Sequence, residues 1–327
     1  MVGDVVSLRP VYKANEQLPE LAMALFDLDD ANSSVGYRNL RNAPAGSMGA
    51  EIKKGLEESW RRYEPYADTI FSKEFAKQVE PRFWEMYLSV CLLASRRKLR
   101  PRADVPDAER NEGPDICISK GRRKIWIEAI APSPGDDKNL DKVPDLFLNA
   151  GDAMQDVPER QIELRITGAL WKKLQAFQRY KQNGIIGDGD SCIVAVSAAQ
   201  FALEAAGEGL SQAVKAVYPF GEEFIELNRR TFEAVRFGHR YSEQIKRAKG
   251  KGDPILRTAF QDERFADISG LIWSRRSTGN FLGQADDLVY VHNQVARKPI
   301  PRKWVRWAEE FYPIDGGKKL RAKKRRK

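Results

Sequence analysis

The stretch GPDICISKGRRKIWIEAI, residues 113–130, has the pattern of a β-hairpin around which the rest of the chain is arranged. Two isoleucine-rich runs flank Gly121-Arg122, and a two-residue type II′ turn favours glycine in its first position. Placing the turn there pairs Lys120 with Arg123. The numbers of paired residues then add up to 243 throughout the hairpin, so the turn alone predicts the register of the two strands.

The two faces of this hairpin differ in character. Side chains alternate along a strand, and the register places Asp115 directly opposite Glu128 on one face. Two opposed carboxylates repel, with Cβ atoms roughly 4.5–5.5 Å apart. Either a divalent cation with oxygen ligands, or solvent with a nearby Arg or Lys, would offset that repulsion. The other face is apolar and predicts packing against a core: Ile116, Ile118, Ile125, Ile127 and Ala129.

The residues around these two acids resemble the signature of the PD-(D/E)XK nuclease superfamily. Pro114-Asp115 opens the first strand, and Glu128-Ala129-Ile130 ends the second. The resemblance implies that Asp115 and Glu128 hold Mg²⁺ (or Mn²⁺) for phosphodiester hydrolysis, with the main-chain carbonyl of Ala129 as a further ligand. It covers roughly residues 80–200. The chain departs from the pattern at Ile130, where the superfamily usually has a lysine that assists the attacking water.

Residues 81–98 predict a buried helix that precedes the hairpin. Pro81 suits a first helical turn, and the segment is apolar almost all round. Glu85 interrupts that surface, and a buried carboxylate needs a cation or hydrogen bonds. Two interpretations stay open. Glu85 pairs with an arginine such as Arg82 or Arg96, or it is the helical glutamate that, as the resemblance implies, joins the two acids of the hairpin in binding the metal.

Residues 159–183 predict a second long helix, with an apolar stripe made by Ile162, Ile166, Leu170, Leu174 and Phe177. Arg165 and Lys172 belong to a polar stripe that either faces solvent or points at the acidic face of the hairpin. Some members of the superfamily take their lysine from the neighbouring helix, so the resemblance makes Lys172 a catalytic candidate. Arg165 and Lys172 are also candidates for contacting nucleic acid. Lys173 is offset by about 100° and is expected to be solvated.

The remaining elements indicate the fold class. The apolar run at residues 191–197 predicts a central strand of parallel type, and residues 266–274 and 287–293 predict two further strands. Residues 222–249 have a helical pattern. The order helix, weak strand within residues 99–112, hairpin, helix, strand matches the restriction-endonuclease-like αβββαβ core. We therefore expect an α/β fold with a mixed central sheet flanked by helices and helical accessory regions.

The chain has 327 residues and a net charge of +9, placed unevenly. Residues 318–327 carry eight positive charges and no acid, so the rest of the chain has a net charge of only +1. Such a tail either contacts phosphates or acts as a solubility segment. We predict a helical accessory region at 1–70, the α/β domain with a C-terminal elaboration at 71–317, and a disordered basic tail at 318–327. Its candidate phosphate contacts are Lys318, Lys319, Arg321, Lys323, Lys324, Arg325, Arg326 and Lys327.

Several classes of protein are disfavoured. No apolar run reaches the eighteen or so residues of a membrane span, and no signal peptide is recognisable at the start, so a cytoplasmic location without membrane contact is expected. The three cysteines, Cys91, Cys117 and Cys192, lie in apolar patterns and suit a reducing compartment. With only two histidines, a zinc site or a Ser-His triad is not expected.

The favoured function is a metal-dependent nuclease acting on DNA (or RNA). The sequence leaves the oligomeric state open, and a homodimer is compatible with it. The alternative is a catalytically inactive nuclease-like module that binds nucleic acid or a protein partner. Ile130 in place of the usual lysine is the feature that favours the alternative.

Overall fold

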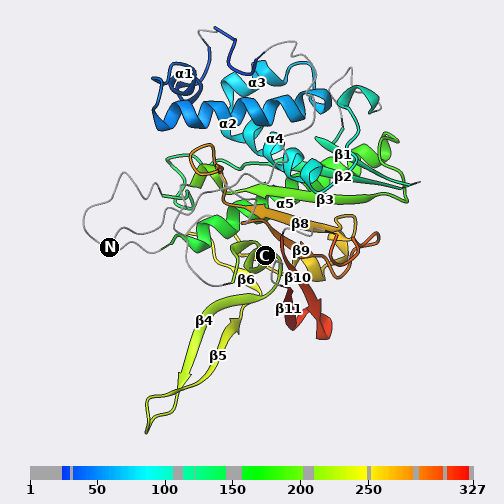
Figure 1. Ribbon diagram of the computed structural model, residues 1–327. Helices are drawn as coiled ribbons and strands as arrows, with labels where there is room; N and C mark the ends of the chain where they lie inside the picture. Colours follow the sequence, from blue (N-terminus) through cyan, green and yellow to red (C-terminus); the bar gives the residue numbers. More distant parts are fainter. Residues whose placement is uncertain are drawn as a thin grey trace.

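A seven-stranded sheet with helices on both faces forms the body of the protein (Figure 1). The computed structural model describes residues 24–29, 32–105, 113–121, 123–144, 157–201, 210–248, 252–282, 287–304 and 308–323. The strands of the sheet, in spatial order, are β1 (Ile116–Lys120), β2 (Arg123–Ile130), β3 (Ser191–Ser197), β8 (Gly270–Ser274), β9 (Val289–His292), β10 (Glu309–Ile314) and β11 (Lys319–Lys323).

Two further strand pairs lie outside this sheet: β4 (Phe220–Leu227) with β5 (Ala234–Tyr241), and β6 (Gln244–Ile245) with β7 (Ile255–Leu256). The α-helices of the described segments are α1 (Val35–Arg41), α2 (Met48–Tyr63), α3 (Phe71–Lys77), α4 (Val79–Ala94), α5 (Glu159–Gln182) and α6 (Gln212–Val217). None of them combines the length and apolar character needed to cross a bilayer.

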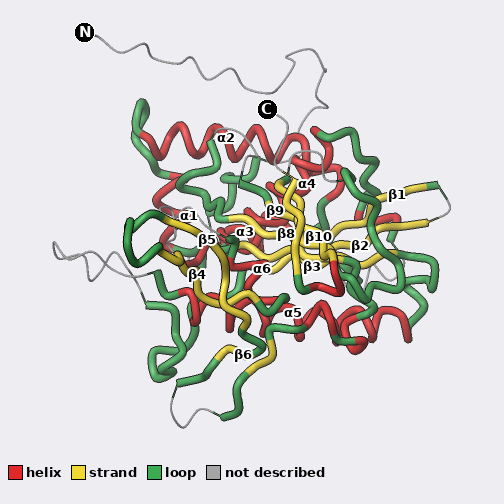
Figure 2. The backbone as a smooth tube through the Cα atoms, turned by 90° about the horizontal axis from the view of Figure 1, so that it is seen from below, coloured by secondary structure: helices red, strands yellow, loops and turns green. Residues whose placement is uncertain are grey.

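Helices lie on both sides of the sheet (Figure 2), and the sheet separates two hydrophobic cores. Helices α1 to α4 pack on one face, where Phe83, Trp84 and Leu88 meet the isoleucines of β1, β2 and β3. Helices α5 and α6 pack on the other, where Leu170 and Phe177 belong to the core that contains Trp126. The N-terminal helices therefore share one core with α4 and the sheet.

The register of the β1–β2 hairpin is confirmed. Lys120 pairs with Arg123 and Ile116 with Ile127, and Gly121 has a φ of 62°, the left-handed value that a tight turn requires of its glycine. Arg122 lies outside the described residues. The apolar face packs under α4 as predicted. The opposite face is not open, because Cys117 and Trp126 are buried beneath α5.

Asp115 differs from the prediction in one respect. It precedes β1, and the last pair of the ladder is Ile116 with Ile127, so Asp115 and Glu128 are not strand partners. The side chain of Asp115 itself accepts a hydrogen bond from the Ala129 N–H at 2.7 Å. The carboxylate thus takes the place of a backbone partner, and the hairpin opens where the two acids lie.

The predicted order of elements is present around the hairpin. Leu99 bridges Ile118 in antiparallel fashion, so a minimal strand lies beside β1 between α4 and the hairpin. Strand β3 is central and runs parallel to both β2 and β8. The two strands predicted beyond residue 260 correspond to β8 and β9. The mixed α/β sheet with flanking helices is confirmed.

The helical pattern assigned to residues 222–249 is wrong, because this segment contains the β4–β5 hairpin and β6. Its apolar residues recur at helix-like spacing, but the side chain of Asn228 accepts hydrogen bonds from the N–H groups of Arg230 and Thr231 and closes a turn. An asparagine that binds its own backbone in this way favours turns over helix.

The prediction of a disordered tail over residues 318–327 is wrong for residues 319–323, which form the edge strand β11. Lys319, Arg321 and Lys323 alternate with Leu320 and Ala322, and Leu320 packs against the core beneath α5 and α6. Lysine on an edge strand is a common way to discourage pairing with other chains, so a basic run is compatible with a strand. Residues 324–327 lie outside the described residues.

Candidate active site

Three acidic side chains gather where the β1–β2 hairpin opens. Glu85 comes from α4, Asp115 from the residue before β1, and Glu128 from the end of β2. The negative charge of Asp115 acts on both glutamates and on the Lys173 ammonium. Asp115 is therefore within electrostatic reach of both Glu85 and Glu128.

Glu85 is buried and is held by two donors. The Tyr63 hydroxyl donates a hydrogen bond to its Oε1 at 2.5 Å, and the Arg82 guanidinium bonds its Oε2 at 2.8 Å. The first of the two interpretations is confirmed, because Glu85 pairs with Arg82. The negative charge of Asp115 also acts on Glu85, and a role of Glu85 in binding a metal stays a prediction.

Helix α4 is fixed over the sheet by the residue next to Glu85. The indole N–H of Trp84 donates a hydrogen bond to the main-chain carbonyl of Ala195 in β3 at 3.0 Å, and the indole is fully buried. A buried indole that finds an acceptor adds orientation to packing. Glu85 is thereby carried to the end of the hairpin by a rigid element.

Glu128 is held from the opposite face of the sheet, by α5. The Lys173 ammonium forms an ion pair and hydrogen bond with its Oε2, and the Tyr180 hydroxyl donates to the same carboxylate. The prediction that Lys172 approaches the acids is wrong. Lys172 is exposed, and Lys173, expected to be solvated, reaches the hairpin instead.

The packing of α5 explains this exchange. Leu170, Leu174 and Phe177 are buried against the sheet, and Lys173 lies at the flank of this stripe, one turn from Leu170. A lysine in that position buries its aliphatic stem along apolar neighbours and extends its charge beyond them. Lys172 belongs to the polar stripe and faces solvent.

Burial raises the pKa of both Glu85 and Glu128 to about 7, and the charge of Asp115 adds to the effect. Burial alone would lower the pKa of Lys173, but the negative charges of Asp115 and Glu128 outweigh it and the pKa is raised. Burial also raises the pKa of Tyr180, and the neighbouring Glu128 adds to it. The positive charges of Arg82 and Lys173 thus compensate only part of the negative charge of the three acids. The cluster therefore favours uptake of a proton or a cation.

The donor set suits a hard divalent ion. Within the described segments, no group of three or more acidic, histidine or cysteine side chains is arranged so that it could hold a metal ion by itself. Mg²⁺ needs fewer protein ligands, because it commonly binds one or two carboxylates and keeps waters and substrate phosphates as its other ligands. Asp115 and Glu128 provide two such carboxylates. The Ala129 N–H binds Asp115, and the ligand role of its carbonyl stays a prediction.

The candidate nucleic-acid contacts are not gathered at this cluster. Arg165 is half-buried and donates to the main-chain carbonyl of Asp141 at 3.2 Å, in the segment that follows β2. Lys319, Arg321 and Lys323 lie on β11, five strands away from β2. At ~4.8 Å per strand this separation is about 24 Å.

Three residues of the cluster are absent from the sequence-based prediction. Lys173 and Tyr180 are seven residues apart and flank one apolar stripe of α5, which is a signal that the sequence contains. Tyr63 ends α2, in the region interpreted as accessory, and no local pattern connects it with Glu85.

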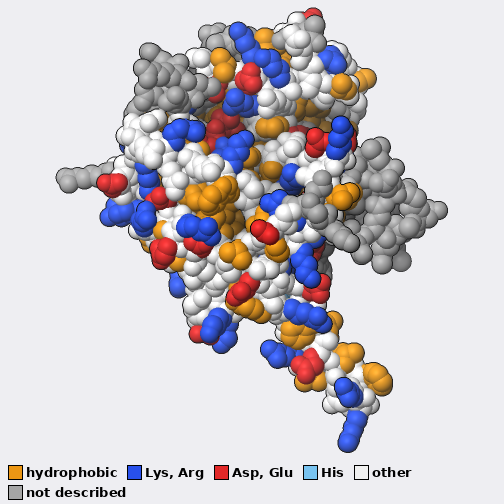
Figure 3. All heavy atoms as spheres, turned by 180° about the vertical axis from the view of Figure 1, so that it is seen from behind, with side chains coloured by type: hydrophobic (Ala, Val, Ile, Leu, Met, Phe, Trp, Pro, Cys, Tyr) orange, Lys and Arg blue, Asp and Glu red, His pale blue; other side chains and the backbone are white. Residues whose placement is uncertain are grey.

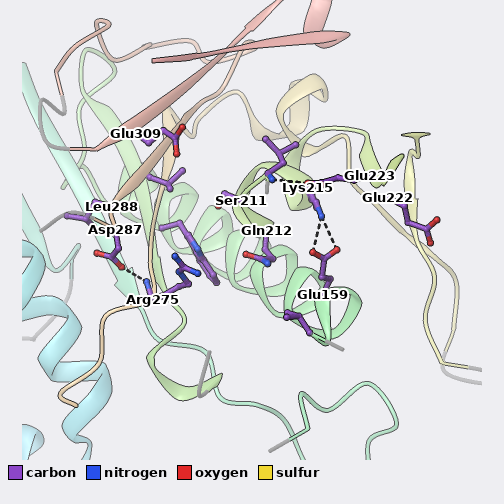
Figure 4. Close-up of a pocket in the computed structure, with 14 residues that line it drawn as sticks. Glu159, Ser211, Gln212, Lys215, Glu222, Glu223, Arg275, Asp287, Leu288 and Glu309 are labelled. Atoms are coloured by element: carbon purple, nitrogen blue, oxygen red, sulfur yellow. Dashed lines mark hydrogen bonds and ion pairs between the residues drawn. The ribbon is translucent and has the colours of Figure 1, made fainter. Parts of the chain in front are cut away.

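A separate pocket of about 450 Å³ lies at the far end of α5 (Figure 4). In it, the Lys215 ammonium binds both carboxylate oxygens of Glu159 at 2.9 Å. Acidic side chains outnumber basic ones in the lining, which includes Glu159, Lys215, Glu222, Glu223, Arg275, Asp287 and Glu309. An anionic substrate would be repelled there, so the pocket does not compete with the hairpin cluster as a phosphodiester site.

Comparison of the chain with protein-family models, with curated proteins and with solved structures finds no significant match.

Proposed function

We propose that this protein is a metal-dependent nuclease whose active site is the cluster of Glu85, Asp115, Glu128 and Lys173. The observation that carries the proposal is the contact of Lys173 with Glu128 beside Asp115. In the superfamily motif, the lysine and the second carboxylate come from the same strand. Here Ile130 occupies the usual position, and α5 supplies the ammonium instead.

Each side chain has a role that its surroundings support. Asp115 and Glu128 would hold Mg²⁺ or Mn²⁺, which when bound supplies charge for the phosphate and acidifies the attacking water. Lys173 would orient that water and stabilise the negative charge that develops on the phosphate. Tyr63 and Arg82 position Glu85 through the hydrogen bonds described above. Asp115 and Ile130 are partly exposed, so a substrate can approach the cluster at the open end of the hairpin.

One observation favours the alternative, an inactive nucleic-acid-binding module. The Lys173 ammonium sits directly on Glu128, so a metal must share that carboxylate with a bound cation. If the ion pair persists in the presence of metal, the carboxylate loses much of its strength as a ligand.

Cleavage by the purified chain decides between the two. Supercoiled plasmid, single-stranded DNA and RNA are incubated with Mg²⁺, with Mn²⁺ or with a chelator. We expect cleavage of at least one substrate with metal and none with the chelator. A chain that binds these substrates but leaves them intact with both metals would support the inactive module.

Metal binding is measured separately from cleavage. Mg²⁺ or Mn²⁺ that binds only the folded chain raises its thermal midpoint with increasing concentration. The shift should disappear in Asp115→Asn and persist in Glu58→Gln, a control at an exposed position of α2. An equal shift in both variants would place the ion elsewhere.

Nucleic-acid binding has its own test. Deleting residues 324–327 removes four positive charges and leaves β11 intact. If all four contact phosphates of a duplex, the slope of log affinity against log salt falls by about 3.6. An unchanged slope would remove these four residues from the interface.

A further inference from the structure

The β4–β5 hairpin, residues 220–241, which we call the arm, projects from the body of the protein (Figure 1). Its two strands form a sheet of their own. The arm is locally well formed, because Ile225 pairs with Phe237 and the turn is closed by the bond from the Phe232 N–H to the Asn228 carbonyl at 2.8 Å. In the space-filling view hydrophobic side chains lie along it among basic and acidic ones (Figure 3).

One face of the arm is apolar and exposed. Ile225 and Phe237 lie opposite each other and are 59% and 71% exposed. Val235 lies at the register shift between β4 and β5, two residues from Phe237, and is similarly exposed. Further exposed apolar side chains along the arm are Leu227, Phe232 and Tyr241.

The other face of the arm is covered by the arm itself. The ring of Phe224 lies over Gly238, where a Cβ would meet it at 2.9 Å, and the Arg236 guanidinium stacks on the same ring at 5.6 Å. Phe224 is therefore packed within the arm on one face, whereas Phe237 is exposed on the other. This asymmetry marks the Ile225–Phe237 face as the surface that binds a partner.

The size of that face suits a pair of arms. A two-stranded hairpin alone is marginally stable in water, and a contiguous apolar patch of several hundred Å² marks an interaction site. Six apolar side chains of on the order of 150 Å² each, about two-thirds exposed on average, give the arm about 600 Å² of exposed apolar side-chain surface. Two arms stacked on each other would bury at most about 1,200 Å², which is the lower limit for a stable interface.

The charges of the arm favour a second copy as the partner. The arm contains four glutamates and four arginines, so its net charge gives nucleic acid no attraction. The charges are nevertheless polarised. Near the tip, Arg229 and Arg230 outnumber Glu233, whereas near the base Glu222 and Glu223 outnumber one arginine, Arg240. In an antiparallel pair the basic tip of each arm meets the acidic base of the other.

We propose that two copies of this chain form a homodimer in which the apolar faces of their arms stack antiparallel about a two-fold axis close to the Ile225–Phe237 pair. A closed two-fold arrangement uses the same patch twice and leaves neither face exposed. The proposal does not depend on the nuclease activity.

The oligomeric state of the full chain tests the proposal. Analytical ultracentrifugation from about 1 to 100 µM should give a dimer for the unaltered chain. Ile225→Lys combined with Phe237→Lys should raise the dissociation constant at least 100-fold, roughly the effect of removing a central hot spot. Leu140→Lys changes a comparably exposed leucine outside the arm, 66% exposed, and should leave the dimer intact.

Two outcomes would overturn the proposal. An unaltered chain that is monomeric at the highest concentration requires a different partner for the arm. A double variant that stays dimeric requires a different interface. Circular dichroism of the variants establishes that the body remains folded, so that neither outcome reflects unfolding.

Charge exchange tests the antiparallel arrangement. Arg229→Glu combined with Arg230→Glu makes both tip and base acidic and should weaken the dimer about tenfold. Adding Glu222→Arg and Glu223→Arg in the same chain restores opposite charges at the two ends and should restore the affinity. Failure of the first pair to weaken the dimer, or of the second to restore it, would rule out the antiparallel pairing.

Discussion

The chain contains two hairpins that differ chiefly in what covers them. The β1–β2 hairpin has α4 on one face and α5 on the other, and Trp126 and all its isoleucines except Ile130 are almost completely buried. The β4–β5 arm has strands of similar length, but Ile225 and Phe237 remain exposed. The formation of a hairpin is therefore a local property of its sequence. Whether its side chains are buried or exposed depends on the helices that pack against it.

The difference also separates two kinds of chemistry. Burial on both faces gives the end of the β1–β2 hairpin a low-polarity environment, in which three acids perturb each other and a lysine is held in place. Charged side chains on the exposed arm perturb one another's pKa values less, because water screens their interaction. The proposed catalytic role of the first hairpin and the proposed partner-binding role of the second both rest on this difference in burial.

The largest expected effect concerns the acids of the first hairpin. Asp115→Asn or Glu128→Gln should lower metal-dependent cleavage at least about 10⁴-fold, because each removes a ligand of the ion that stabilises the transition state, worth about 5 kcal/mol. Single-turnover cleavage assays measure the loss, and Glu58→Gln serves as control. Full activity of either variant would remove the acid cluster from the mechanism.

Next in size is the effect of the lysine from α5. Lys173→Met should lower the cleavage rate by roughly 10²–10⁴-fold while the metal-induced thermal shift is kept. The matched control is Lys172→Met, the same change one residue away on an exposed face of the same helix. Equal rates for the two variants would contradict the role assigned to Lys173.

A smaller effect on stability compares the two hairpins directly. Ile127→Ala removes a fully buried side chain and should lower the free energy of unfolding by about 3 kcal/mol. Ile225→Ala should change it by less than about 0.5 kcal/mol in the dilute monomer, because the side chain is largely exposed. Urea unfolding at low protein concentration measures both, and similar losses would mean that the arm packs against its own body.

The smallest expected effect is the change that Asp115→Asn makes in the pH dependence of stability. Glu85 and Glu128 have pKa values raised from 4.5 to about 7, chiefly by burial and then by Asp115. The folded state therefore binds protons more tightly than the unfolded state, and stability falls as pH rises from about 4.5 to 7. Asp115→Asn removes the second cause and should reduce that fall by about 1 kcal/mol.

Urea unfolding of the chelator-treated chain at a series of pH values measures this difference. Glu58→Gln, at an exposed position of α2, should follow the unaltered chain. Parallel curves for the unaltered chain and Asp115→Asn would show that Asp115 does not act on the two glutamates.

The sequence by itself determined the parts of the protein that depend on neighbouring residues. Turn chemistry at Gly121 and the alternation of isoleucines gave the register of the β1–β2 hairpin, which brings Asp115 close to Ala129 and Glu128. Continuous apolar runs identified α4 and β3 as buried elements. These signals are reliable because each arises from contacts within one helix or one hairpin.

Only the tertiary structure decided which side chains meet across elements. The rotation of α5 on the sheet selects Lys173 over Lys172, and that rotation depends on how Leu170 and Phe177 pack beneath it. The contact of Tyr63 with Glu85 joins residues of two helices, and no spacing within either helix encodes it. The same holds for the arm and for β11, where similar local patterns become exposed or paired according to the layers available to cover them.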